Sequence, residues 1–165
     1  MSSMLHYDFE ESHAYWVVMT AHAFERALAD ELGPHGITYR QWQVLGWLAH
    51  EGELSQVQLA DRMRIEPPTL VGILDRMEKA NWIRRTGCRN DRRRKFITAT
   101  ASAIPVWSRV VECAKRVRAE SAVGITPKEL AQLKSTLDRI RANLSTRRCG
   151  KTPENEKPCL DQYAL

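Results

Sequence analysis

Seven basic side chains crowd into one short stretch of this 165-residue chain, between positions 84 and 95. They are Arg84, Arg85, Arg89, Arg92, Arg93, Arg94 and Lys95, beside a single acid, Asp91. Seven cations against one anion give the stretch a net charge of +6, whereas the whole chain carries +5, so the remainder is close to neutral. A cationic cluster on an otherwise balanced protein favours a polyanion as its partner. A solvated charged loop would explain the run equally well, so the neighbouring elements must decide.

No comparable set of residues in the sequence indicates catalysis. The sequence has no phosphate-binding loop, nucleophile elbow, metalloprotease motif or pair of carboxylates at a catalytic spacing. The histidines are His6, His13, His22, His35 and His50. They are scattered along the chain, and such residues more often lie on a surface or pack against a neighbour than catalyse. We therefore predict no enzyme activity, no cofactor and no metal site.

The cysteines leave one alternative open. They are Cys88, Cys113, Cys149 and Cys159. None forms a C-x-x-C pair, so reduced thiols are expected. A redox- or metal-responsive regulator is still an alternative, because Cys149 and Cys159 could pair between chains on oxidation, although incidental thiols explain them better. A plain protein-interaction module is a further alternative, but it would leave the +6 stretch without a purpose.

The cationic stretch falls on a predicted β-hairpin. Residues 82–86 and 95–100 are two short β-prone runs, and residues 87–94 between them form a polar loop that contains glycine. A hairpin of this kind can track phosphates and place an arginine in the minor groove of DNA, where the potential is negative.

Shortly before this hairpin, residues 58–77 have the pattern of a helix-turn-helix. Ser55 and Gln58 form a capping box that begins a helix, which we expect to end near position 63. Pro67 marks the start of a second helix, since proline fits the first turn. That helix is expected to end near Asn81, because asparagine tolerates the left-handed conformation of a helix stop.

The apolar pattern of the motif predicts which face is free. Packing against the core is expected for Leu59, Ala60, Ile65, Leu70, Val71, Leu74 and Met77. The opposite face of the second helix holds Thr69, Gly72, Ile73 and Arg76 and stays free to enter a major groove. Helical hairpins with similar spacing are common in proteins that do not bind DNA, so it is the cationic hairpin directly after this motif that favours DNA binding.

Further helices are expected over residues 9–32, 38–52, 101–122 and 127–144, which gives a mainly α fold with a small β-hairpin (α+β). One helix carries the apolar stripe Val17, Ala21, Phe24, Leu28 and Leu32. The last carries Leu130, Leu133, Leu137, Ile140 and Leu144, an a/d seam suited to another helix. Packing within the monomer would produce the same repeat. Because no stretch is apolar enough to span a membrane, the expected compartment is the cytoplasm.

The order of elements and their motifs resembles the MarR family of bacterial regulators, in particular its SlyA/RovA branch. The matching residues are Leu54 to Ala60, Ile65-Glu66, Pro68 to Val71, Leu74-Asp75, Asn90 to Arg93, Lys95, residues 97–100, Gly124-Ile125 and Glu129-Leu130. The match covers roughly residues 10–144. It implies a winged helix-turn-helix transcriptional regulator, associated with the bacterial nucleoid, that binds a palindromic site in double-stranded DNA as a homodimer. In many members a small aromatic or phenolic ligand weakens DNA binding.

The resemblance also implies a division of the chain. Residues 1–36 would be a dimerisation arm, 37–101 the winged helix-turn-helix lobe, 102–146 the dimerisation helices and 147–165 a mobile polar tail. The implied dimer interface includes Phe9, Leu130, Leu133, Leu137, Ile140 and Leu144.

The implied DNA contacts centre on the wing. Arg92 matches the wing arginine that enters the minor groove, and Asp91 matches the acid that pairs with Arg93 to brace the wing. The full predicted DNA-binding set is Ser55, Gln56, Pro68, Thr69, Gly72, Arg76, Arg85, Asn90, Asp91, Arg92, Arg93 and Arg94. The sequence departs from the family pattern where Arg64 replaces the glycine of the turn. It departs again where Gly72 replaces an arginine, for which Arg76, one turn further on, can substitute.

Ligand pockets of the family form between the dimer arm and the DNA-binding lobe. The residues that fall there are His13, Trp16, Thr20 and Trp42. Large aromatic side chains line small-molecule sites, but they also fill cores. We expect Trp42 to belong to the core and leave Trp16 with His13 open.

Overall fold

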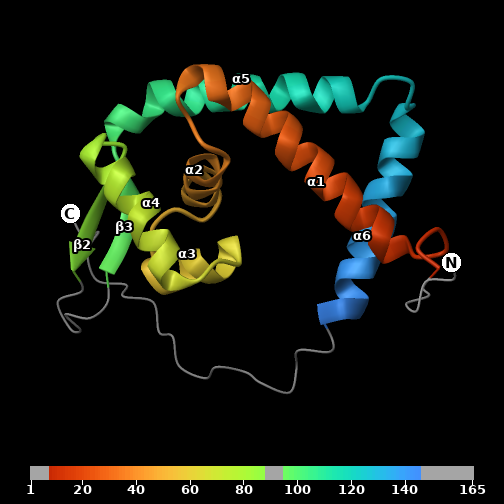
Figure 1. The fold of residues 1–165 in the computed structure, drawn as a ribbon, viewed down its shortest axis with the longest axis horizontal. Coiled ribbons are helices and arrows are strands. Elements are labelled where there is room, and N and C mark those ends of the chain that lie inside the picture. The colour runs from red at the N-terminus through yellow and green to blue at the C-terminus, as the bar shows by residue number, and fades with distance from the viewer. Residues whose placement is uncertain (1–7, 88–94, 146–165) are drawn as a thin grey trace, which may run out of the picture. The chain divides into compact units, whose positions relative to one another are not determined.

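The computed structural model describes residues 8–87 and 95–145, and the chain divides into two compact units, Met1–Ser121 and Ala122–Leu165. The helices of the first unit are α1 (His13–Leu32), α2 (Tyr39–Glu51), α3 (Gln56–Met63), α4 (Pro67–Lys79) and α5 (Ile104–Ser121), with 3₁₀ turns at Gly33–His35 and Ala101–Ala103 (Figure 1). The described helix of the second unit is α6 (Pro127–Ser145). The mainly helical fold class is confirmed.

A small antiparallel sheet completes the first unit. Its strands are β1 (Leu54–Ser55), β2 (Ile83–Gly87) and β3 (Lys95–Ala99), in the order β1-β3-β2. The antiparallel pairing of β2 with β3 confirms the predicted hairpin. The sequence did not predict β1, in which Leu54 lies opposite Ile97, because two residues are too few for an alternating pattern.

The local signals at the ends of helices are confirmed. The hydroxyl of Ser55 accepts the N–H of Gln58 at 3.2 Å, and the side chain of Gln58 accepts the N–H of Ser55 at 2.9 Å. The structure has a further capping box of the same kind before α6, formed by Thr126 and Glu129. Asn81 follows α4 with a φ of 60°, in the left-handed region.

Two helices begin later than predicted. α1 begins at His13 rather than at position 9, because Ser12 caps it and its hydroxyl accepts the N–H of Tyr15 at 3.3 Å. α5 begins at Ile104 rather than at position 101, because Ala101–Ala103 is a 3₁₀ turn. Pro105 therefore falls in the first turn of α5, where a missing N–H breaks no helical bond.

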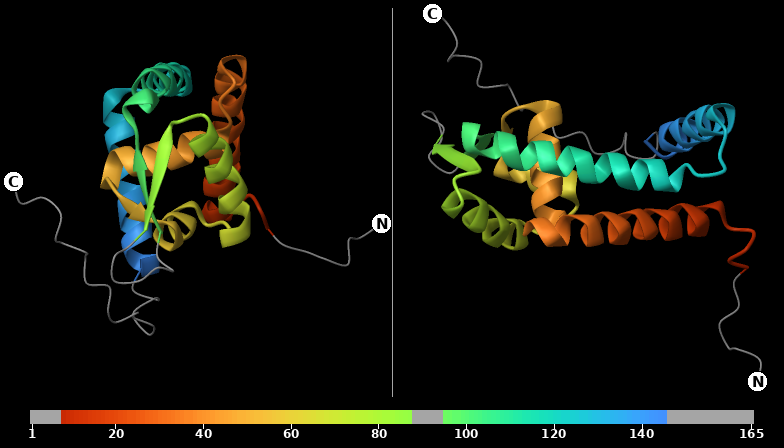
Figure 2. Two further views of the ribbon diagram at one scale, coloured as in Figure 1. Left: turned by 90° about the vertical axis from the view of Figure 1, so that its left-hand side faces the viewer. Right: turned by 90° about the horizontal axis from the view of Figure 1, so that it is seen from above.

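The apolar stripe of α1 is only partly used within the chain. Figure 2 shows α1 and α5 side by side. Of the predicted stripe, Leu28 and Leu32 are buried, whereas Val17 and Phe24 are 42% and 44% exposed. Two adjacent helices bury only their facing positions, so the first half of α1 keeps apolar side chains on its surface.

One hydrophobic core joins the motif helices to the sheet. Its largest fully buried side chains are Leu32, Val44, Leu59, Leu70, Leu74, Met77, Ile83, Ile97, Val110 and Cys113. They come from all five helices of the first unit and from both strands of the hairpin. Close packing of this kind fixes the position of the hairpin beside α4.

The predicted seam of α6 lies on the surface of the single chain. No residue of α6 is buried, and Leu130, Leu133 and Leu144 are 39%, 53% and 56% exposed. Leu137 and Ile140 are half-buried. None of the helices in the described ranges has both the length and the hydropathy of a membrane span.

Candidate nucleic-acid interface

The corner between α3 and α4 has the geometry of a helix-turn-helix. Arg64 adopts the left-handed conformation, with φ 50° and ψ 48°, directly after α3. Ile65 in the turn is half-buried and packs against the core, as predicted. The carbonyl of Glu66 accepts the N–H groups of Thr69 and Leu70 at 3.0 and 3.2 Å, and α4 begins there.

The buried face of α4 differs from the prediction at two positions. Its buried residues are Leu70, Ile73, Leu74 and Met77. The prediction is wrong for Ile73, which is only 4% exposed, and for Val71, which is 39% exposed. At about 100° per residue, the four buried residues share one narrow arc of the helix and Val71 lies outside it.

The outward side of α4 brings three predicted residues together. Thr69 and Arg76 are exposed and Gly72 is half-exposed between them. A Cβ atom placed on Gly72 would meet nothing closer than Nη1 of Arg76, at 3.9 Å. The Arg76 guanidinium therefore lies above Gly72, near the position that a side chain at 72 would cover. Pro68 is exposed one turn earlier.

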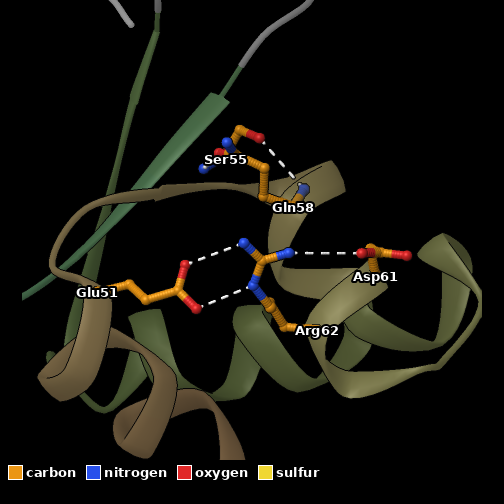
Figure 3. A network of polar contacts seen from close by, with 5 residues as sticks. All are labelled: Glu51, Ser55, Gln58, Asp61 and Arg62. Carbon is orange, nitrogen blue, oxygen red and sulfur yellow. Dashed lines mark hydrogen bonds and ion pairs between the residues drawn. The ribbon is translucent and has the colours of Figure 1, made fainter. Parts of the chain in front are cut away.

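The start of α3 corrects another prediction. Ser55 is 3% exposed, and both its hydroxyl and its N–H bond to Gln58 (Figure 3). A buried residue that caps a helix is not available to a phosphate, so Ser55 leaves the predicted DNA-binding set. Gln56 is half-buried at the first position of α3.

Arg62 connects α3 to α2. Its Nε and Nη2 donate to the carboxylate of Glu51 at 2.9 and 3.2 Å, and its Nη1 lies 3.5 Å from Oδ2 of Asp61 (Figure 3). The hydrogen bond between them lowers the pKa of Glu51 and raises that of Arg62. Because exposed ion pairs contribute little stability, this network links α3 to α2 without adding much to the free energy of unfolding.

Arg85 also differs from its predicted role. Only 16% of its side chain is exposed. Its Nη1 donates to Asp75 at 2.6 Å and to Glu78 at 3.0 Å, and its Nη2 donates to the carbonyl of Val71 at 3.3 Å. The guanidinium therefore faces α4, and the structure does not present it as a contact for DNA. This network was not predicted, although two acids three residues apart before a cationic strand are visible in the sequence.

The tip of the wing lies outside the described residues. The pairing of β2 with β3 is described as far as Gly87 opposite Lys95. Asn90, Asp91, Arg92, Arg93 and Arg94 fall between these ends. The roles of Arg92 in the minor groove and of Asp91 and Arg93 in bracing the wing stay predictions.

The predicted ligand residues separate into two groups. His13, Trp16 and Thr20 are exposed on α1, and the Trp16 indole N–H donates to the carbonyl of Glu10 at 3.0 Å. Trp42 packs against the core and lines a cavity of about 250 Å³. The cavity is lined by Trp42, Trp107, Val110, Val111, Ala114, Lys115 and Arg118. The three α1 residues are not part of this lining.

The cavity combines apolar walls with two cations. Tyr39 lies beside Trp42, with ring centroids 5.0 Å apart, and burial, followed by the nearby Glu25, raises the pKa of its phenol. Lys115 lies 2.8 Å from a carboxylate oxygen of Glu112. A pocket with aromatic walls and basic side chains at its edge suits an aromatic anion.

Cys113 is the cysteine within the described ranges. It is buried, and its thiol donates to the carbonyl of Glu31 at 3.5 Å. The described residues contain no group of three or more His, Cys, Asp or Glu side chains that could hold a metal ion. Cys88, Cys149 and Cys159 lie outside these ranges, so the redox alternative is not tested.

Fold and site together define a winged helix-turn-helix. A model of the MarR family matches residues 35–94. Transcriptional regulator PA3341 is 32% identical, with 82% of this chain and 99% of that chain covered and a TM-score of 0.73. The chain belongs to the MarR family of transcriptional regulators.

Two further solved structures are similar. NadR in complex with 4-hydroxyphenylacetate is 26% identical, with 85% of this chain and 97% of that chain covered and a TM-score of 0.68. MepR of S. aureus in complex with DNA is 24% identical, with 81% and 98% covered and a TM-score of 0.68.

Proposed function

We propose that the protein is a sequence-specific DNA-binding regulator of the SlyA/RovA type that acts as a homodimer on a palindromic operator and catalyses no reaction. The observation that carries the proposal is the outward side of α4, where Thr69, Gly72 and Arg76 lie together. The helix is held beside a strand that leads into the +6 stretch. A helix presented in this way fits the major groove, and the cations beside it suit the phosphate backbone.

Dimerisation is supported by apolar side chains that the single chain leaves on its surface. Phe9, Trp16 and Phe24 are 54%, 54% and 44% exposed at the N-terminal end of the chain. Leu133 and Leu144 of α6 are 53% and 56% exposed. Exposed apolar surface of this extent is typical of protein interfaces. We assign residues 1–36 and 102–146 to the dimer interface and residues 37–101 to DNA binding.

In this arrangement the dimer reads two half-sites whose centres are about one helical turn, roughly 10 base pairs, apart. α4 reads the middle of each half-site in the major groove through Thr69 and Arg76. The wings reach the outer flanks, where a narrow A·T-rich minor groove attracts Arg92.

Selection of bound duplexes from a random DNA pool tests this proposal. The expected result is a palindrome with A·T-rich flanks, together with a dimeric mass in analytical ultracentrifugation at micromolar concentration. Recovery of DNA without a shared sequence would contradict sequence-specific regulation, and a monomeric mass would contradict the two-half-site arrangement.

We further propose that a small aromatic acid or phenol weakens DNA binding by occupying the cavity beside Trp42. Support comes from the two tryptophans of the lining and from Lys115 and Arg118 at its edge. NadR, a similar regulator, was solved with 4-hydroxyphenylacetate bound. This proposal moves the ligand from Trp16 to Trp42 and Trp107, because His13, Trp16 and Thr20 are not among the residues that line the cavity.

A further inference from the structure

We propose that Arg85 is a positioning residue that locks the wing strand β2 to α4 and so sets DNA specificity without touching DNA. The inference rests on the proposed DNA-binding function, because specificity can be measured only where DNA is bound. It goes beyond that function by assigning part of the discrimination to a contact within the protein.

The geometry of the contact is a clamp along one side of α4. The three acceptors of the Arg85 guanidinium belong to Val71, Asp75 and Glu78. Positions separated by four and three residues lie on one stripe of a helix, so a single planar guanidinium spans two turns of α4. The backbone N–H of Arg85 also donates to Glu78, at 3.1 Å, so both the main chain and the side chain of β2 are attached.

The strand end of the clamp is equally constrained. Arg85 lies opposite Ile97 in the β2–β3 ladder, and Ile97 is fully buried. A displacement of Arg85 relative to α4 would therefore move the hairpin or disturb the core. Since the hairpin leads into the cationic stretch, the clamp fixes the angle between the wing and α4, the two elements proposed to contact different grooves.

The clamp also pairs Arg85 with two acidic side chains of α4. The side chain of Asp75 is 57% exposed and that of Glu78 is 40% exposed. Without a cation between them, both carboxylates would repel nearby phosphates. Arg85 therefore supports DNA binding in two ways. It fixes the angle between the wing and α4, and it neutralises two carboxylates.

The contact also carries a cost to stability. Nε of Arg85 is buried and has no hydrogen-bond partner among the described residues. A buried donor without a partner reduces the free energy of unfolding. A lysine or an apolar side chain would leave no such donor, but neither carries the fork of donors with which arginine reaches three acceptors.

The experiment measures specificity for three variants of the full chain. Arg85→Gln removes the clamp, Arg85→Lys keeps the charge but not the planar fork, and Arg84→Gln removes a matched charge from the exposed neighbour on the same strand. Fluorescence anisotropy gives the affinity of each for a labelled palindrome selected by the wild type and for a scrambled duplex of equal length and composition. The specificity ratio is the affinity for the palindrome divided by the affinity for the scrambled duplex.

We expect Arg85→Gln and Arg85→Lys to lower the specificity ratio about tenfold or more, and Arg84→Gln to lower both affinities together and leave the ratio within about twofold. Asp75→Asn, at an exposed position, is expected to lower the ratio in the same direction with an unchanged melting temperature. It keeps the test decisive if the Arg85 variants unfold.

Two results would overturn the inference. One is a wild-type ratio in Arg85→Lys, which would show that charge alone suffices. The other is a wild-type ratio in Asp75→Asn, which would show that the contact between Arg85 and α4 does not set specificity. Failure of the wild type to select any sequence would instead contradict the proposed function itself, so the two failures are distinguishable.

Discussion

The guanidinium of Arg76 lies above Gly72, with Nη1 3.9 Å from the point where a Cβ atom on that glycine would stand. Long side chains on a helix point back toward its N-terminus, so Arg76 covers surface that belongs to the preceding turn. The missing side chain at 72 leaves that surface open. The Arg76 guanidinium can thus reach nearly the place on α4 that an arginine at position 72 would reach, although Arg76 lies one turn further along the helix.

Substitutions at Gly72 are therefore expected to change helix stability and DNA specificity independently. Gly72→Ala places a methyl group in ordinary contact with Arg76 and should stabilise the helix by roughly 1 kcal/mol, with unchanged DNA preference. Gly72→Leu should instead displace Arg76 and lower discrimination between the selected palindrome and scrambled DNA by at least tenfold. Thermal unfolding and anisotropy titrations measure the two effects. If both variants discriminate as the wild type does, Arg76 does not depend on the open space at 72.

Arg76 should read one base pair in each half-site. Arg76→Ala is expected to relax the preference at that base pair, and each bidentate pair of hydrogen bonds that it removes should weaken discrimination by about 1–3 kcal/mol. Lys79, the exposed cation one turn further on, provides the control. Lys79→Ala should weaken all sequences alike, because a phosphate contact carries no sequence information. Binding to a set of single-base variants of the palindrome distinguishes the two, and equal profiles would remove Arg76 from base readout.

The wing prediction concerns salt dependence. Arg92→Ala should reduce the slope of log affinity against log salt by about one per wing, hence about two per dimer. Arg93→Ala should act differently, because its loss frees Asp91 to repel the DNA backbone. A salt series on the palindrome and on scrambled DNA provides the measurement. Unchanged affinity of Arg92→Ala at every salt concentration would refute the assignment of Arg92 to the minor groove.

Dimerisation should depend on the seam of α6. Leu133→Glu places a charge on a side chain that is 53% exposed in the single chain, so it should dissociate the dimer without unfolding the first unit. Gln132→Glu adds the same charge at the adjacent exposed position and should stay dimeric. Sedimentation velocity at micromolar concentration gives the masses. A dimeric Leu133→Glu protein would place the interface elsewhere.

Ligand control should follow the chemistry of the cavity. Salicylate is expected to quench tryptophan fluorescence and to weaken operator binding, and operator DNA should weaken salicylate binding by the same factor, because the coupling is reciprocal. Arg118→Gln should reduce both effects, and neutral benzyl alcohol should produce neither at the same concentration. Saturation with salicylate at unchanged operator affinity would exclude this compound as a regulator.

The sequence predicted local structure well wherever one residue carries a physical signal of its own. The capping box at Ser55 and Gln58 and the left-handed Asn81 are such cases, because each follows from a side-chain hydrogen bond or a backbone preference. The hairpin followed from two β-prone runs around a polar loop. None of these features needs information on distant parts of the chain.

Predictions failed where the answer depends on tertiary neighbours. Val71 and Ile73 are both apolar and two positions apart, and only the packing of α4 decides which is buried. Arg85 is a cation in the cationic stretch and was therefore predicted to contact DNA, but its bonds to Asp75 and Glu78 hold it against α4. Trp16 and Trp42 are similar in type, yet the cavity includes Trp42 because α5 passes beside it. Periodicity and charge do not contain this information.

Arg64 adopts the left-handed conformation in the turn between α3 and α4, where folding places only a weak constraint on the type of residue. The conformation costs a side-chain-bearing residue about 1–2 kcal/mol, and a glycine would avoid that cost. A glycine, however, would give the unfolded chain more freedom, which offsets about 0.4–1 kcal/mol of the gain. Because the second effect offsets roughly half of the first, arginine is tolerated here at a small net cost to folding. What distinguishes arginine from glycine is a positive charge at the outer corner of the two helices, so the identity of this residue is open to selection by the negatively charged partner.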